Sequence, residues 1–406
     1  MKDKSDPQDQ ALRAATRLVA AGRRPEWTGA VVNPPVWRAS THLYENTAAL
    51  AAGPRRNEDG RFFYGRRGAP TQWALADALT AMEPGAAGTV LYPSGVAAIA
   101  GVLLTLVRPG DVVLMTDNAY DPSRAMGQGL LADFGVETRY FDPLDLASYQ
   151  AAFCDRTRVV LLESPGSLTM EVCDVPTLAR IARERGATSV FDNTWAGPTG
   201  FAALTHGIDI VLMALTKHVG GHSDLMMGSA SAGLDLYKRL RLRAQNLGHV
   251  VSPDDAALAL RGLRTLSLRL ERETASALTV ATWLKEQPQV AAVLCPMLPG
   301  GAGHELWKRD YTGGCGLFSF VLRGGDAVRR NRFIDALSLF GIGYSWGGFE
   351  SLATPVDPAP VRSAMAWPPT DANPDDRYGV RLSIGLEDPA DLITDIGQAL
   401  AAMDVA

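Results

Sequence analysis

The sequence predicts an α/β protein in which a mostly parallel sheet has helices on both faces and is followed by a smaller C-terminal α+β domain. From about residue 70, short continuous Val/Leu/Ile runs, which are typical of buried parallel strands, alternate with helical segments. After a long helical segment at 253–287, the order of strands and helices changes. The 406 residues, 47% of them hydrophobic, suffice for a large core divided among two or three domains.

Five apolar runs are expected to form the strands of the parallel sheet, with helices between them. The expected strands are 88–92, 112–116, 158–162, 188–191 and 208–213, and the expected helices are 71–82, 96–107, 122–134 and 175–186. The uncharged stretch 84–107 is interrupted by Pro93, Ser94 and Gly95. These breakers favour a strand, a turn and a helix over a membrane span.

The remaining segments complete the expected organisation. The leucine-rich segment 253–287 predicts one long helix or a kinked pair, and 290–314 is expected to be a joining segment. The C-terminal part is then expected to contain strands at 316–323, near 342–345 and at 379–385, with helices at 326–340 and 389–403. We expect an N-terminal arm over 1–68, with one candidate helix near 8–22, a main domain over 69–260 and a C-terminal domain over 261–406.

Composition argues against several classes of protein. A net charge of −5 and 20% charged residues give no footprint for nucleic acid and no sign of disorder. The cysteines Cys154, Cys173, Cys295 and Cys315 form no C-x-x-C pair, so a zinc cluster is not expected and a reducing cytosol is the simplest location. No signal-peptide core follows the charged N-terminus, so cytoplasmic localisation is expected.

Polar residues follow each of the five expected strands. Ligands bind at the carboxyl ends of strands in open α/β sheets, so these residues are expected to surround one small volume. They are Ser94 and Gly95; Asp117, Asn118 and Tyr120; Glu163 and Ser164; Asp192, Asn193 and Trp195; and Thr216, Lys217 and His218.

This set of residues suits one cofactor, pyridoxal 5'-phosphate (PLP). The turn at Gly95 opens a helix whose N–H groups and dipole favour a phosphate. Tyr120 can stack on an aromatic ring, and Asp192 can keep a pyridine nitrogen protonated, which makes the ring an electron sink. Lys217 can form the imine with the cofactor aldehyde.

Each of these residues has a simpler explanation when it is taken alone. Asp192 is equally consistent with a helix N-cap, and Lys217 with a solvated surface lysine. Gly95 is consistent with an ordinary turn and Tyr120 with packing. An apolar strand ending in Asp, followed 25 residues later by one ending in Lys, is the combination that favours the cofactor site.

From about Thr16 to Glu387 the chain resembles the Cys/Met-metabolism family of fold-type I PLP-dependent enzymes, and most closely its β-lyases. No single motif is specific, but together they are. The matching motifs stand at Val32–Val36, Tyr64–Gly68, Tyr92–Gly95, Asp192–Ala196, Thr216–His218, Gly262–Leu266, Ser345–Gly348 and Arg381–Glu387. The resemblance implies that 69–260 is the PLP-binding domain.

The resemblance also implies roles for individual residues. Lys217 would be the imine-forming lysine, Asp192 the partner of the pyridine nitrogen and Tyr120 the stacking ring. The phosphate would be bound by the backbone N–H groups of Gly95 and Val96, by the Thr216 hydroxyl, and by Tyr64 and Arg66 from a neighbouring subunit. Arg381 would bind the substrate α-carboxylate beside Ser345 and Trp346, with Tyr64 also near the substrate; a guanidinium suits that task.

Two positions depart from the family pattern. Ala214 stands where a Ser or Thr usually gives the phosphate another hydroxyl. A hydrogen bond to a charged group is worth about 1.5–3 kcal/mol, so weaker cofactor binding is expected unless another group substitutes. Close relatives also have a tyrosine near Ala257, and its absence puts a role for an aromatic ring there in doubt.

The implied reaction is cleavage of L-cystathionine to L-homocysteine, pyruvate and ammonia, as a step toward methionine. Lys217 would remove the Cα proton, and Lys217 or Tyr120 would return a proton to the departing sulfur. Trp346 favours the β-lyase subgroup, because γ-enzymes generally have a smaller apolar residue there; packing of Trp346 in the core is the alternative. A broader cysteine-S-conjugate β-lyase or cysteine desulfhydrase and a cystathionine γ-synthase remain open.

Two alternatives belong to other classes. The chain is also consistent with a PLP-binding regulatory protein of weak activity. His218 and His222 have the i, i+4 spacing of metal ligands, but Gly220 and Gly221 between them argue against a regular helix and no third ligand is evident, so no metal is expected. If Tyr64 and Arg66 complete a neighbour's site, the protein is at least a dimer, and the resemblance implies a dimer of dimers.

Overall fold

The computed structural model describes residues 12–55, 58–370 and 372–404, which divide into two compact units. The described part of the first unit lies within Met1–Thr105, Ala202–Thr205 and Asp209–Ser267. The second lies within Leu106–Phe201, His206–Ile208 and Leu268–Ala406. No helix in the described ranges is long and apolar enough to cross a membrane.

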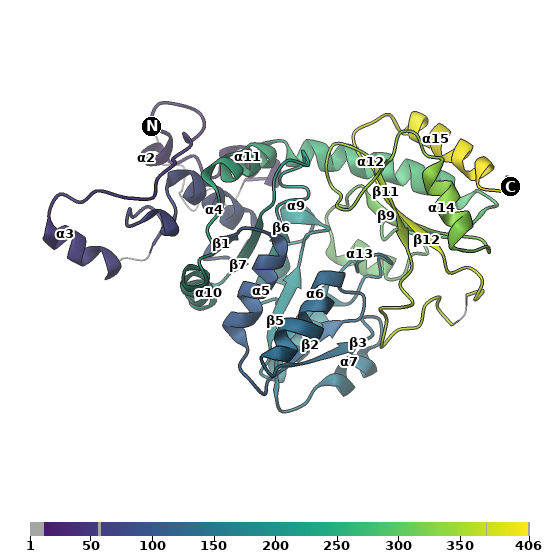
Figure 1. Ribbon diagram of the computed structural model, residues 1–406, viewed down its shortest axis with the longest axis horizontal. Helices are drawn as coiled ribbons and strands as arrows, with labels where there is room; N and C mark the ends of the chain where they lie inside the picture. The colour runs from purple at the N-terminus through teal and green to yellow at the C-terminus, as the bar shows by residue number, and fades with distance from the viewer. Residues whose placement is uncertain (1–11, 56–57, 371, 405–406) are drawn as a thin grey trace. The chain divides into compact units, whose positions relative to one another are not determined.

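The first unit has three strands in the order β1-β7-β6, and each pairs with its neighbour in antiparallel fashion (Figure 1). Helices α4 and α10 pack against β1, and α11 packs against α4. The strands are β1 (Gly88–Tyr92), β6 (Ile210–Ala214) and β7 (Gly228–Ala232). The helices are α1 (Ala14–Ala20), α2 (Pro25–Thr28), α3 (Thr47–Ala52), α4 (Pro70–Met82), α5 (Gly95–Leu106), α10 (Leu234–Leu247) and α11 (Pro253–Arg264).

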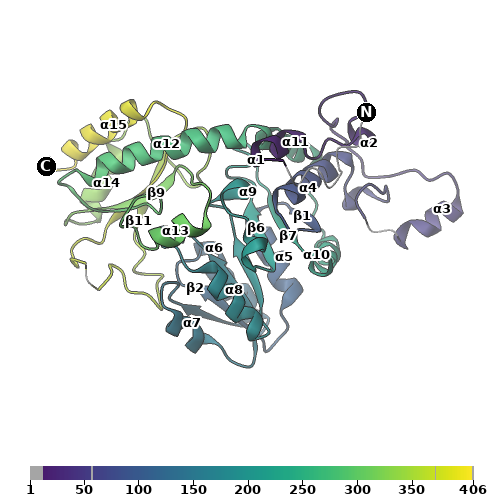
Figure 2. The same cartoon turned by 180° about the vertical axis from the view of Figure 1, so that it is seen from behind.

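The second unit contains four parallel strands in the order β5-β4-β2-β3. Their side chains are almost all buried in β2 and β4, as expected for strands covered on both faces. Helix α8 packs against β4 and β5, and the reverse view shows it in front of the sheet (Figure 2). The elements are β2 (Val112–Thr116), α6 (Asp121–Met126), β3 (Glu137–Phe141), α7 (Leu146–Ala152), β4 (Thr157–Glu163), α8 (Val175–Glu184), β5 (Thr188–Asp192) and α9 (Gly197–Gly200).

The same unit contains a second sheet, in the order β10-β11-β12-β9-β8, in which only the β10–β11 pair is parallel. Every side chain of β9 is buried, and α14 packs against β11 and β12. The elements are α12 (Leu266–Lys285), β8 (Val290–Leu294), α13 (His304–Asp310), β9 (Leu317–Leu322), α14 (Ala327–Asp335), β10 (Gly341–Ile342), β11 (Leu352–Val356), β12 (Gly379–Ser383) and α15 (Pro389–Ala402).

The strands predicted for the first half of the chain are all present, within two residues at each end. The prediction missed β3, β7, β8 and β11. Strand β7 has the sequence Gly-Ser-Ala-Ser-Ala, which lacks the branched residues that identify a buried strand. The predicted joining segment 290–314 contains β8 and α13, so it is not a simple linker.

Several predicted boundaries also change. The segment 253–287 is a pair of helices, α11 and α12, that separate at Thr265. The predicted helix 122–134 is α6 up to Met126, followed by π-helical turns over Gly127–Leu131. The strand expected near 342–345 is shorter and earlier, as β10. The candidate helix near 8–22 is α1; residues 8–11 of that prediction lie outside the described residues.

Candidate active site

The turn between β1 and α5 lies close to the ends of β6 and β7 in the first unit. A Cβ added to Gly95 would lie 2.8 Å from the Cβ of Ala214, the last residue of β6. A Cβ added to Gly228 at the start of β7 would lie 2.3 Å from the Ser94 carbonyl oxygen. Only glycine permits these approaches, so the first turn of α5 is held beside the segment that follows β6.

This first turn of α5 has the properties of an anion cradle. The Ser94 hydroxyl accepts the N–H of Ala97 at 3.0 Å and caps the turn. The first N–H groups of a helix, here those of Gly95 and Val96, have no carbonyl partner within the helix, and they lie at the positive end of its dipole. The Val96 side chain is exposed. The structure therefore places both predicted phosphate donors where a phosphate would be favoured.

Lys217 lies in a compact turn just beyond β6. Its N–H donates to the Ala214 carbonyl at 3.1 Å, and its own carbonyl accepts the N–H of Gly221 at 2.8 Å. The Thr216 hydroxyl accepts the N–H of Met227 at 3.0 Å and donates to the Met227 carbonyl at 3.2 Å. Thr216 therefore anchors this turn to the segment before β7, and a phosphate would have to compete with the Met227 carbonyl for its proton.

Lys217 differs from the other described lysines in position and burial. Lys238, Lys285 and Lys308 lie on helices and are exposed, whereas Lys217 follows a sheet strand and is partly buried. Lys2 and Lys4 lie outside the described residues. Its place in a partly buried turn at a strand end is the position expected for an imine-forming lysine.

In the second unit, Asp192 ends β5 directly beside Glu163, which ends β4; the two are partners in the parallel register. One oxygen of Asp192, Oδ1, accepts the N–H of Thr194 at 2.9 Å and also the Thr194 hydroxyl. Two donors on one carboxylate oxygen favour the ionised form. Asp192 is therefore suited to pair with a protonated pyridine nitrogen.

Tyr120 stands at the N-terminus of α6, and the residue is 39% exposed. Its N–H donates to Oε2 of Glu163 at 2.7 Å, which connects the tyrosine to the end of β4. Partial burial raises the pKa of the Tyr120 hydroxyl, the negative charge of Asp192 raises it further, and Arg381 opposes that effect. Glu163 stands at the end of an expected strand, but the sequence indicates no role for it. Its pairing with Asp192 depends on the register between β4 and β5, which only the structure shows.

The predicted substrate residues come together in this unit as well. The Arg381 guanidinium on β12 donates through Nη2 to the Ser345 carbonyl at 3.3 Å. Ser345 has a φ of 86°, a backbone conformation that is strained for a side chain other than glycine, and Gly347 is held by a 3.1 Å hydrogen bond to the Ser383 hydroxyl. Trp346 lies between them in this constrained turn. Burial lowers the pKa of Arg381, and the neighbouring Tyr120 and Asp121 counter that effect.

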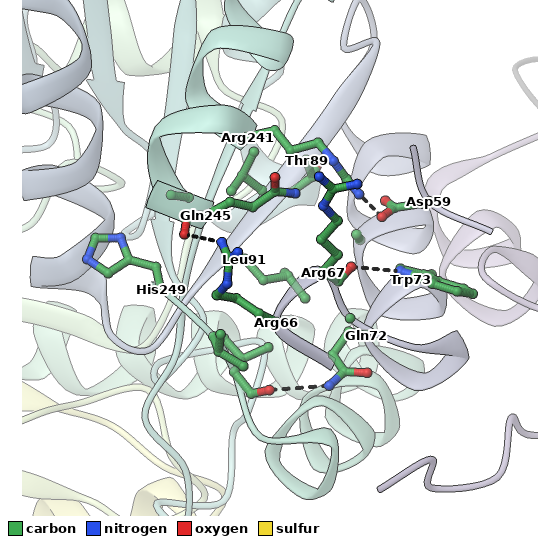
Figure 3. A pocket seen from close by; sticks show the side chains of 16 residues that line it. Asp59, Arg66, Arg67, Gln72, Trp73, Thr89, Leu91, Arg241, Gln245 and His249 are labelled. Atoms are coloured by element: carbon green, nitrogen blue, oxygen red, sulfur yellow. Dashed lines mark hydrogen bonds and ion pairs between the residues drawn. The ribbon is translucent and has the colours of Figure 1, made fainter. Parts of the chain in front are cut away.

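Arg66 lies against its own chain in the first unit. Its Nη1 donates to the Gln245 carbonyl at 2.6 Å, in the last turn of α10, where a cation is favoured (Figure 3). The same pocket contains Arg67 and the Arg241–Asp59 ion pair, with an N–O distance of 2.6 Å. Tyr64 is 48% exposed. The role of Tyr64 and Arg66 at a neighbour's phosphate stays a prediction.

The described residues contain no group of three or more His, Cys, Asp and Glu that could hold a metal ion. His222 contacts the Gly220 carbonyl through Nδ1 at 2.8 Å, and His218 is buried. The first unit has a cradle that a Cβ would fill and a partly buried lysine, which fit the phosphate and the aldehyde of PLP. The second unit has a carboxylate with two donors, which fits a pyridine nitrogen.

Residues 15–401 match the family described as Cys/Met metabolism PLP-dependent enzyme. The chain belongs to this family. The predicted family, fold class and PLP cofactor are confirmed. Over 389 residues the chain is 43% identical to cystathionine beta-lyase MetC of Escherichia coli K12, covering 95% of this chain and 98% of that protein.

Two further comparisons agree with this assignment. A putative cystathionine beta-lyase of Rhizobium johnstonii is 43% identical over 410 residues, covering 99% of each chain. The crystal structure of metB from Corynebacterium glutamicum superimposes with a TM-score of 0.86 at 29% identity, covering 97% of this chain and 99% of that one.

Proposed function

We propose that this enzyme cleaves the Cβ–S bond of L-cystathionine and, with water, releases L-homocysteine, pyruvate and ammonia. The observation that carries the proposal is the contact between Arg381 and Ser345 in the same unit as Tyr120 and Asp192. This unit therefore contains Arg381 as a cation for the substrate carboxylate, with Tyr120 as the stacking ring and Asp192 as the partner of the pyridine nitrogen. The choice of β-cleavage rests on the relatives named cystathionine beta-lyase, which are 43% identical over nearly the whole chain.

In this proposal both groups of residues serve the same cofactor. Gly95, Val96 and Thr216 bind its phosphate, and Asp192 holds the proton of its pyridine nitrogen. PLP, when bound, withdraws electrons from Cα of the amino acid, which makes the Cα proton acidic. Arg381 binds the α-carboxylate and thereby fixes which bond at Cα faces the base.

Lys217 is the proposed proton carrier. Its amine accepts the Cα proton and then delivers a proton to the departing sulfur, so the thiol leaves neutral. Tyr120 is the alternative donor to sulfur. Burial raises the pKa of its hydroxyl, so that group holds a proton at neutral pH. Ser345 and Trp346 shape the wall beside the α-carboxylate.

We also propose that the enzyme is a dimer of dimers in which the N-terminal arm lies on a neighbouring subunit. Apolar side chains that a lone chain leaves in water support this: Val31, Val32, Val36, Trp37, Leu43, Leu50 and Phe62 are exposed, Leu43 by 93%. Arg66→Ala should then weaken PLP binding. Unchanged affinity would count against the role of the arm.

The proposed metabolic role is a cytoplasmic step of methionine biosynthesis. Growth of a methionine auxotroph that lacks cystathionine cleavage, restored by this chain and not by Lys217→Ala, would support that role. Failure of the wild-type gene to restore growth despite soluble expression would contradict it.

The decisive test of the reaction is a product assay on the PLP-loaded enzyme. L-cystathionine, L-cystine, and O-succinylhomoserine with cysteine are compared as substrates. Pyruvate from cystathionine, at the highest kcat/KM, is the expected result. 2-Oxobutyrate as the main product would contradict β-cleavage, and negligible turnover at full PLP occupancy would favour a regulatory protein.

A further inference from the structure

Glu163 is a partly buried acid at the end of β4, and the reaction proposed above gives it no task. Its position opposite Asp192 in the parallel register places the two acidic residues side by side at the carboxyl ends of β4 and β5. Neighbouring carboxylates repel each other, so one of them is expected to hold a proton.

The hydrogen bonds around the two acids differ. Asp192 receives both the N–H and the hydroxyl of Thr194 on Oδ1, and these donors favour its ionised form. Glu163 receives the Tyr120 N–H at 2.7 Å. Burial raises the pKa of Glu163 well above its usual range, Asp192 and Asp121 add to that effect, and Arg362 and the Tyr120 N–H oppose it. The proton of the pair therefore belongs on Glu163.

We propose that Glu163 is a positioning residue of the cofactor site, a neutral carboxyl that holds the Tyr120 main chain and leaves Asp192 as the ionised partner of the pyridine nitrogen. The inference rests on the proposed function for the roles of Tyr120 and Asp192. Glu163 itself acts through these two residues. A neutral neighbour removes a repulsion that would otherwise draw the pyridine proton onto Asp192, and the N–H contact fixes the start of α6, which carries the Tyr120 ring.

Substitutions at Glu163 separate these effects. Glu163→Gln keeps a neutral group with a carbonyl acceptor of the same length, so PLP affinity, the visible spectrum of the bound cofactor and kcat should stay within about twofold of wild type. Glu163→Ala removes the acceptor for the Tyr120 N–H. It should weaken PLP binding by about tenfold, which corresponds to one hydrogen bond, and shift the absorbance of bound PLP.

Glu171→Ala is the matched control. Glu171 is a buried acid of the same unit that accepts hydrogen bonds from Asn118 and Thr169, at 3.2 and 2.6 Å, rather than from Tyr120. Its removal should lower the melting temperature without moving the spectrum of bound PLP. This separates a general loss of stability from a specific effect at the cofactor.

A direct readout is the infrared band of a protonated carboxyl at pH 7. The difference spectrum between wild type and Glu163→Gln should show the loss of one such band. The proposal would be overturned by any of three results. The band could be absent, or Glu163→Gln could be as impaired as Glu163→Ala. Glu163→Ala could also bind PLP with the affinity and the spectrum of the wild type. These readouts use PLP alone, so they remain decisive even if wild type fails to cleave cystathionine, which would overturn only the proposed reaction.

Discussion

Replacing Ala214 by Ser should strengthen PLP binding. Ala214 ends β6, and its Cβ would lie 2.8 Å from a Cβ built on Gly95, so its side chain faces the first turn of α5. A serine hydroxyl at this position would face the proposed phosphate cradle. The nearby Thr216 hydroxyl donates to the Met227 carbonyl, so it does not replace the missing donor without breaking that bond.

The size of the effect follows from one hydrogen bond to a charged group. Such a bond contributes about 1.5–3 kcal/mol, and each 1.4 kcal/mol is tenfold in affinity. The dissociation constant for PLP should therefore fall by roughly 10- to 100-fold in Ala214→Ser. Gly95 lies close to Ala214, so serine adds the hydroxyl with the least bulk. Two larger residues of equal size are then needed to separate the effect of a hydroxyl from the effect of added bulk.

The assay is titration of the cofactor-free enzyme with PLP, followed by absorbance. Ala214→Thr and Ala214→Val form the matched pair, because they add nearly the same bulk and differ by the hydroxyl. The threonine variant should bind PLP at least tenfold more tightly than the valine variant. Equal affinities in that pair, together with no gain in Ala214→Ser, would refute the placement of the cradle.

Three other substitutions have defined outcomes. Arg381→Lys loses the two-pronged contact with a carboxylate and should lower kcat/KM for cystathionine about 100-fold, mainly through KM, in steady-state assays. Asp117→Ala should lower the melting temperature sharply, because it leaves the buried Arg124 guanidinium without its 2.8 Å partner, a loss of about 3–5 kcal/mol. Glu83→Gln should change how the melting temperature depends on pH. Burial raises the pKa of Glu83 to about 7, so the unfolded chain loses its proton first and wild-type stability falls as pH rises from about 4.5 to 7, by on the order of 3 kcal/mol.

Each of these expectations has a contrary result. A fall in kcat at constant KM in Arg381→Lys would assign Arg381 to the chemical step rather than to carboxylate binding. A wild-type melting temperature in Asp117→Ala would mean that the hydrogen bonds from Ser363, Ala364 and Met365 to Asp117 add nothing to stability. If the melting temperatures of Glu83→Gln and wild type change with pH in the same way between pH 5 and 8, Glu83 is ionised in the folded enzyme.

The sequence allowed prediction of those parts of the site that depend on strand ends. Asp192, Lys217 and Gly95 were found because each directly follows an apolar run, or a two-residue turn after one, and such runs are recognisable without a structure. Strand β7 was not predicted because its small residues lack the apolar pattern of a buried strand. Without that strand, the close packing of Gly228 against Ser94 could not be predicted either. The register between neighbouring strands is also invisible in the sequence.

Glu163 illustrates that limit most clearly. Its place at a strand end was evident, but its partnership with Asp192 depends on which strand lies next to β4 and in which register. The hydrogen bond from the Tyr120 N–H depends on the conformation of the turn after β2, which no local pattern specifies. Long-range pairing therefore separates the residues that the sequence could assign from those that required the structure.

The central claim is that Lys217 carries the cofactor. Borohydride reduction of the PLP-loaded enzyme, followed by peptide mapping, tests it directly, because the chain has few other lysines and those described lie exposed on helices. We predict one reduced pyridoxyl group, on the peptide that contains Lys217, and none in Lys217→Ala. A pyridoxyl group on Lys238, Lys285 or Lys308 in the wild-type enzyme would contradict the account.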